Sequence, residues 1–289
     1  MSRFSWSKIG GMTLALPLAA TCFLFFLYPL SYLFYISLHQ ASQTEIYGDG
    51  PTLQNYYQIA TDDFYRAVVR NTVISALTVL AACLVLGYGT AYSIAKMSAR
   101  WRLVFLLLLT FPLLVSNVIR AYGWMTILGR SGVVNAALAG AGAIDAPLAL
   151  LYGFPAVVFG LMTIMLPYMI IPLVSTLSVI DNQYREAAFS LRAGPIRTFL
   201  YVTLPLSSPG MAAGMMLVFL LTLSAYVTAN ILGGAQAKIV VSLVYDSVVI
   251  FNWPRAAALS FALLGIALVG AAAITLVMRP GRVRGKKTA

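Results

Sequence analysis

The chain has 289 residues, of which 61% are hydrophobic and 9% charged, and its formal net charge is +11. Soluble domains contain about 45–50% apolar and about 25% charged residues. This composition therefore excludes an ordinary water-soluble globular domain and indicates a polytopic membrane protein.

Long uncharged runs divide the chain. They cover residues 9–38, 71–95, 103–119, 146–180, 206–237 and 256–278. A spanning helix needs about 20 residues, and the short third run reaches that length if Arg120 extends to the interface. The sequence therefore predicts an all-α protein with six transmembrane helices.

The predicted helices follow in chain order, with polar or charged segments between them. They are expected at about 12–38, 68–95, 103–119, 154–180, 211–232 and 256–278. The pattern divides the chain into a basic arm, first helix and outer segment (1–66), a five-helix region (67–278) and a basic tail (279–289).

The basic residues are unevenly distributed between the two sides of this arrangement. If the N-terminus is cytoplasmic, the entire charge excess lies in the cytoplasmic segments, where only Asp181 and Glu186 oppose the Lys and Arg residues. The outer segments then carry equal numbers of basic and acidic residues. The positive-inside rule therefore predicts that both termini are cytoplasmic, and the distribution argues against nucleic-acid binding.

Motifs for catalysis or metal binding are missing from the sequence. His39 is the only histidine, and Cys22 and Cys83 fall within apolar spans, which favours buried thiols over a metal site. No GxxxxGK[ST] motif occurs, so we expect no ATP hydrolysis in this chain. We expect neither a metal nor a cofactor bound by it.

The charged segment 181–210 lies between two long apolar runs. Apolar residues recur at helical spacing before and after Ala193-Gly194-Pro195, which interrupts the pattern. The segment therefore predicts a helix–turn–helix hairpin at the membrane surface, with one apolar and one basic side.

This hairpin resembles the EAA loop of permease subunits of binding-protein-dependent ABC importers. The matching residues are Glu186-Ala187-Ala188 and Val202-Thr203-Leu204-Pro205. Arg192 stands where that family has glycine, and Gly194 follows two residues later. Either the turn is shifted, or Arg192 adopts a conformation that glycine usually supplies.

Further segments resemble the first permease of spermidine/putrescine-type importers. They are Ile119-Arg120-Ala121-Tyr122-Gly123 with Gly132 and Asn135, Leu166-Pro167, Leu232-Gly233-Gly234 and Asn252-Trp253-Pro254.

The resemblance implies a type I importer transmembrane domain at 67–278 in the bacterial inner membrane. It implies a second related permease, two ATPase copies that bind ATP and Mg²⁺, a periplasmic binding protein and membrane lipids as partners. The residues implied in ATPase coupling are Glu186, Ala187, Ala188, Leu191, Arg192, Gly194, Leu204 and Pro205. For Glu186, an exposed carboxylate that only balances Arg185 is the alternative.

Polyamine cations favour aromatic faces and carboxylates in their path. The candidates near the outer helix ends are Tyr122, Trp124, Tyr226, Tyr245, Asp246 and Trp253. For the aromatic residues, interfacial anchoring is the alternative, and for Asp246 a solvated loop position. Related branches of the family carry opines, other amines or organophosphonates.

Two other classes of function remain as alternatives. One is a stand-alone channel or secondary carrier. An ion-coupled carrier usually needs an ionisable group within a span, and the expected spans have none at their centres. A membrane enzyme would need clustered His, Cys or paired carboxylates, which the sequence lacks. The uncharged spans and the charged hairpin instead favour a transport subunit driven by a separate ATPase.

Overall fold

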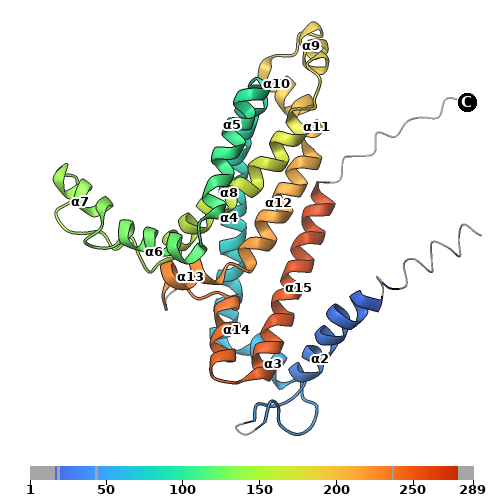
Figure 1. Ribbon diagram of the computed structural model, residues 1–289, viewed down its shortest axis with the longest axis vertical. Coiled ribbons are helices and arrows are strands. Elements are labelled where there is room, and N and C mark those ends of the chain that lie inside the picture. The colour runs from blue at the N-terminus through green and yellow to red at the C-terminus, as the bar shows by residue number, and fades with distance from the viewer. Residues whose placement is uncertain (1–16, 18–19, 43–44, 236, 279–289) are drawn as a thin grey trace, which may run out of the picture. The chain divides into compact units, whose positions relative to one another are not determined.

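The computed structural model describes residues 17, 20–42, 45–235 and 237–278, and these residues are predominantly helical (Figure 1). An isolated β-bridge pairs His39 with Pro51. The chain divides into two compact units: residues 1–66 with 243–262, and residues 67–242 with 263–289.

The first unit contains helices from both ends of the sequence. They are η1 (Phe23–Leu27), α2 (Tyr28–Ser37), α3 (Gln54–Thr61), the start of α4 (Asp63–Ala95), most of α14 (Val240–Val249) and the start of α15 (Trp253–Val277). The Asn55 carboxamide donates to the carbonyls of Ser37 and His39, and the Ser37 hydroxyl lies 2.7 Å from that of Tyr56. These bonds fix α3 against the end of α2.

The second unit contains the remaining elements and the rest of α4, α14 and α15. They are α5 (Ala99–Thr110), η2 (Phe111–Leu114), α6 (Asn117–Leu128), α7 (Val133–Gly140), α8 (Phe154–Leu177), α9 (Gln183–Ser190), α10 (Pro195–Thr198), η3 (Phe199–Thr203), α11 (Leu204–Leu206), α12 (Ser208–Leu223) and α13 (Tyr226–Gly233).

Helices α4, α8 and α12 build the core of the second unit. Their buried side chains include Val79, Leu161, Leu173 and Val218, and α8 packs along α12 through small residues. A Cβ added at Gly214 of α12 would lie 3.1 Å from the Met169 carbonyl of α8. Small residues allow such close approach of helix backbones in membrane proteins.

Four helices are long and apolar enough to cross a membrane, and the described part contains six candidate spans if each of two bent pairs counts as one. The straight candidates are 20–37, Asp63–Ala95, Phe154–Leu177 and Trp253–Val277. The sequence prediction of an all-helical polytopic membrane protein is confirmed in this form.

Three of the predicted helix boundaries are wrong by five residues or more. The second helix begins at Asp63 rather than residue 68. The third helix ends at Leu114 rather than residue 119, because Val115 and Ser116 are extended and the chain then bends by 91° into α6. The fifth helix ends at Leu223 rather than residue 232, because Ala225 leaves the helical conformation before α13 begins. In Figure 1, α6 and α7 consequently project sideways from α5 and α8.

Candidate functional site

The predicted hairpin at 181–210 lies at one end of the second unit, where α9 and α10 extend beyond the ends of α5 and α8 (Figure 1). A tight turn at residues 191–194 separates α9 from α10. The helix–turn–helix prediction for this segment is confirmed by these elements.

Arg192 sits in the turn with φ = 59°, which is the left-handed conformation. Its amide donates to the Phe189 carbonyl, and the Ala193 amide donates to the Ala188 carbonyl. These two bonds form the Schellman arrangement that ends many helices, in which glycine usually occupies the left-handed position. Gly194 has φ = −69° and acts as the N-cap of α10. The turn is therefore not shifted, and Arg192 takes the conformation expected of glycine.

The outer side of the hairpin is apolar and accessible. Leu191, at the start of the turn, is 85% exposed, and Ile196, which follows the turn in the sequence, is 74% exposed. Glu186 lies in the first turn of α9 and is also exposed. Arg66 and Asp63 form the single ion pair among the described residues, so Glu186 does not pair with Arg185. The hairpin therefore exposes a carboxylate and two large apolar side chains.

The inner side of the hairpin is fixed to α4. The Phe199 ring lies edge-on to Tyr88 at 5.5 Å and to Tyr92 at 6.0 Å between centroids. The Tyr88 hydroxyl lies 2.8 Å from the Ser207 hydroxyl at the junction of α11 and α12. Sequence reasoning missed both tyrosines, although their spacing of one helical turn, near the charged end of α4, was a signal for a shared contact face.

Two cations add to this contact. The Lys96 ammonium lies 4.1 Å and the Arg185 guanidinium carbon 5.3 Å from the Tyr92 ring centroid. Both distances are within the range of cation–π attraction. The hairpin is therefore connected to α4 through aromatic and charged side chains, and a displacement of α9 would act directly on Tyr92.

Pro205 shapes the exit of the hairpin. In a regular α-helix, the proline ring would clash with the backbone carbonyl one turn earlier. Residues 199–203 instead form a π-helical turn before Pro205. Leu204 packs against the core, whereas Pro205 is exposed. The chain then bends by 67° into α12.

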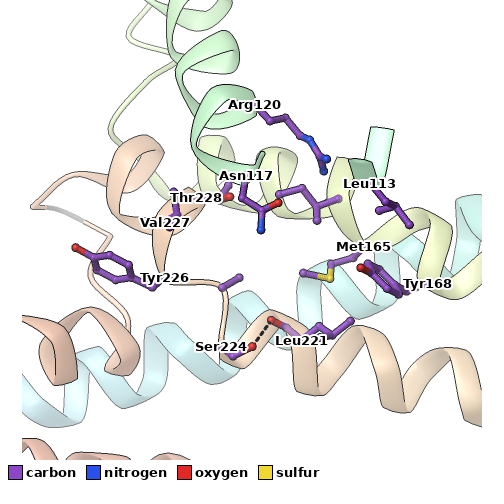
Figure 2. Close-up of a pocket in the computed structure, with 12 residues that line it drawn as sticks. Leu113, Asn117, Arg120, Met165, Tyr168, Leu221, Ser224, Tyr226, Val227 and Thr228 are labelled. Atoms are coloured by element: carbon purple, nitrogen blue, oxygen red, sulfur yellow. Dashed lines mark hydrogen bonds between the residues drawn. The ribbon is translucent and has the colours of Figure 1, made fainter. Parts of the chain in front are cut away.

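A second feature is a pocket of about 270 Å³ where the two helix breaks face α8 (Figure 2). Its lining residues are Leu113, Asn117, Arg120, Ile164, Met165, Tyr168, Leu221, Ser224, Ala225, Tyr226, Val227 and Thr228. Figure 2 shows the Asn117 carboxamide and the Met165 thioether directed into the same space. Broken helices beside a polar space are typical of transporter binding sites, because their end carbonyls and amides are free for a ligand.

Arg120 is the charged side chain of this lining, which contains no carboxylate. Its Nη2 donates to the carbonyls of Pro112 and Val115 at the break, where the Pro112 carbonyl also accepts the Val115 amide. Its Nη1 is buried and forms no hydrogen bond with any residue that the structure describes. The guanidinium therefore stabilises the bend between η2 and α6 and makes the pocket electropositive.

The six predicted path residues are divided between the two units, three in each. Tyr226 lines the pocket, although its ring points away from the central space in Figure 2. Trp124 of α6 packs edge-on against Phe159 of α8 at 4.7 Å, and Tyr122 is exposed. The other three, Tyr245, Asp246 and Trp253, lie on α14 and α15 in the first unit. Sequence reasoning missed Asn117 and Tyr168 because neither contact follows from a local pattern.

Across the described ranges, no group of three or more His, Cys, Asp or Glu side chains could hold a metal ion.

Comparisons with known proteins agree on the class of protein. The profile of the family described as binding-protein-dependent transport system inner membrane component matches residues 83–279. The chain is 32% identical over 237 residues to the spermidine/putrescine transport system permease protein PotB of Haemophilus influenzae, covering 82% of each chain. It is 33% identical to PotB of Escherichia coli, covering 82% of this chain and 85% of that protein.

A solved structure has the same fold. A chain of a bacterial alginate ABC transporter, in complex with alginate pentasaccharide-bound periplasmic protein, superposes with a TM-score of 0.73 at 18% identity. The match covers 95% of this chain and 97% of that one. Together with the family match over most of its length, these findings show that the chain belongs to the binding-protein-dependent transport system inner membrane component family, as a multi-pass permease subunit of an ABC importer rather than an enzyme.

Proposed function

We propose that this permease forms part of the path by which polyamines such as spermidine or putrescine cross the bacterial inner membrane. The observation that carries the substrate class is the identity of 32–33% over 82% of the chain to spermidine/putrescine permeases. A periplasmic binding protein would deliver the solute, and a second, related permease would complete the path as a heterodimer.

The hairpin at 181–210 is the proposed dock for the ATPase. Its outer side exposes Leu191, Ile196 and Glu186. Its inner side contacts Tyr88 and Tyr92 of α4. Closure of two ATPase copies, which would bind ATP and Mg²⁺, would then move the hairpin and α4 together. Rigid-body motion of this kind opens a transporter alternately to each side.

The proposed orientation places the hairpin in the cytoplasm. Lys96, Arg100 and Arg102 lie at the same end of the second unit as α9, and basic residues concentrate on the cytoplasmic side of membrane proteins. Both termini are then cytoplasmic.

The pocket at the helix breaks is the proposed transit site. The hydroxyls of Tyr168 and Ser224 and the carboxamide oxygen of Asn117 can accept hydrogen bonds from an amine. The cation of Arg120 would weaken the binding of a polyamine at this point, which suits a site that the solute must leave again. Selection of the solute would then reside mainly in the binding protein.

Arg120 also supports a second candidate. A pocket with a guanidinium and no carboxylate favours a solute that carries an anionic group, such as an opine or an organophosphonate. The same ATPase-driven import would apply to that solute.

The test uses the assembled importer, purified with its second permease and ATPase and reconstituted in vesicles. Binding protein loaded with spermidine or putrescine should stimulate ATP hydrolysis and uptake. Stimulation by an anionic solute instead would establish the second candidate, and transport by this chain alone would refute the importer function.

The coupling role of Glu186 is tested in the same vesicles. Glu186→Lys should retain the assembled complex and basal ATP hydrolysis but lose uptake, because the carboxylate is exposed and forms no ion pair with any described residue. Asp181→Asn is the matched control, since this carboxylate in the same segment accepts a local bond from the Gln183 amide. Unchanged uptake by Glu186→Lys would rule out that role.

A further inference from the structure

A polar cavity of about 560 Å³ lies beside the hairpin, away from the pocket at the helix breaks. Its lining residues are Ala95, Lys96, Arg102, Leu177, Ser178, Ile180, Asn182 and Arg185. The ends of α4 and α8, the start of α5 and the start of α9 therefore meet around it. The volume falls in the range of about 300–1,000 Å³ that is typical of small-molecule sites.

All the ionisable residues that line this cavity are basic. Lys96 comes from the end of α4, Arg102 from α5 and Arg185 from α9, and the lining contains no carboxylate. The nearby carboxylates, Asp181 and Glu186, are exposed and outside the lining. Three cations held together without an acidic partner repel one another, and an anion between them would remove that repulsion.

Two guanidinium N–H groups of the lining also lack a hydrogen-bond acceptor among the described residues. The Nη2 of Arg102 donates to the carbonyls of Ala95 and Met97, so this side chain is held in place as a cap on α4. The Nε atoms of Arg102 and Arg185 are both buried, yet neither forms a hydrogen bond within the described part of the chain. A buried guanidinium N–H without an acceptor is costly, and phosphate oxygens are preferred acceptors for such groups.

The position of the cavity indicates where its anion comes from. Helix α8 is uncharged and 24 residues long, or about 36 Å, which is enough to cross the hydrocarbon core of about 30 Å. The cavity lies at the end of that helix and thus at headgroup level. Trp101 is exposed at the start of α5, and Leu103 and Leu107 are exposed further along the same helix. An exposed Trp followed by exposed leucines is the pattern of a helix that starts at the membrane interface and enters the hydrocarbon core.

We propose that this cavity binds the phosphate group of an anionic membrane lipid, such as phosphatidylglycerol or cardiolipin. Basic pockets between transmembrane helices bind such headgroups in other membrane proteins. The phosphate would connect Arg185 of the hairpin to Lys96 and Arg102 at the α4–α5 connection. This inference goes beyond the transported solute and depends only on the membrane setting of the chain.

The experiment titrates short-chain phosphatidylglycerol into the assembled importer in phosphatidylcholine nanodiscs and counts bound lipid by native mass spectrometry. The test variant is Lys96→Gln with Arg185→Gln, which leaves the capping Arg102 intact. The matched control is Arg100→Gln with Arg197→Gln, because both residues are exposed, lie in the same two connections and are absent from the lining. The single variant Lys96→Gln, at an exposed position, serves if the double variant fails to assemble.

We expect the double variant to bind phosphatidylglycerol roughly 30-fold more weakly than the wild type, since each basic residue contributes about 1 kcal/mol. The single variant should weaken binding about fivefold on the same basis. The control should bind as the wild type does, and phosphatidylcholine should show no dependence on either variant.

Two outcomes would overturn the proposal. Equal lipid binding by test and control variants would show that the cavity is not the site, or that a side chain of the ATPase occupies it in the complex. Inorganic phosphate that displaces the lipid and loses its own binding in the test variant would show that free phosphate, not a headgroup, is the ligand.

Discussion

The hydroxyl groups of Tyr88 and Ser207 lie 2.8 Å apart, although 119 residues separate them in the sequence. Ser207 is fully buried, and its hydroxyl also donates to the Leu204 carbonyl, so Tyr88 is the donor in the pair. Ser207 is the residue at which the chain bends from α11 into α12. The pair therefore fixes the exit of the hairpin to α4.

We expect Tyr88→Phe to lower the free energy of unfolding by about 0.5–1.5 kcal/mol, because the Ser207 hydroxyl loses its donor in a buried place. Thermal unfolding of the purified importer measures this change, and uptake in vesicles measures its effect on coupling. Tyr92→Phe is the control, since it retains the ring that faces Lys96 and Arg185. An equal loss in both variants would argue against a specific role for the Tyr88–Ser207 bond.

Arg192→Gly should raise the free energy of unfolding by up to about 1 kcal/mol, because glycine adopts a positive φ without the steric cost of a Cβ. Arg192→Val should lower it by about 1–3 kcal/mol, because a β-branched side chain is strained there. Unfolding measurements on both variants test this expectation.

A stable Arg192→Gly variant with normal uptake would show that the guanidinium is dispensable for coupling. If Arg192→Val proved as stable as the wild type, the left-handed turn would not exist in the membrane.

Gly210→Ala should destabilise the contact between α12 and α8 by about 1–3 kcal/mol, because small-to-large changes in a packed core force the backbone to move. A Cβ at this position would lie 2.6 Å from the Pro172 carbonyl. Gly89→Ala is the matched control on a helix, since a Cβ there meets nothing within 4 Å. The control should be neutral or stabilising by about 0.5–1 kcal/mol, and equal melting temperatures for the two variants would contradict the packing.

Arg120→Gln should cost about 1.5–3 kcal/mol of stability, because charge-assisted bonds to two carbonyls at the bend are lost. Uptake should fall along with the stability, since the bend that shapes the pocket loses these two bonds. Arg130→Gln removes the same charge from an exposed position outside this pocket and should have little effect. Faster uptake of polyamine with unchanged stability would mean that Arg120 is only an electrostatic barrier.

The hairpin shows how much of the structure can be predicted from a local sequence pattern. Helical spacing and the break at Ala193-Gly194-Pro195 were enough to predict two short helices with a turn between them, and the structure confirms both. The left-handed Arg192 remained one of two alternatives, because a sequence with glycine two residues away admits either turn. Which one forms depends on the two capping bonds to Phe189 and Ala188.

The pocket illustrates the opposite case. Aromatic and acidic residues near predicted helix ends were plausible path residues, yet the lining depends on Asn117, Arg120 and Tyr168, which lie on two different helices. Their proximity follows from the bends after Leu114 and Leu223, where the apolar pattern continues without a signal that the helix stops.

The sequence by itself determined the class of protein, the approximate spans and the hairpin, because burial in a bilayer demands long apolar segments and the hairpin carries its own charge and turn residues. Only the tertiary structure decided the two helix breaks, the contact of Tyr88 with Ser207 and the clustering of Lys96, Arg102 and Arg185. The physical reason is that a membrane helix is apolar both toward lipid and toward its neighbours. Its periodicity therefore does not reveal which face packs against which helix.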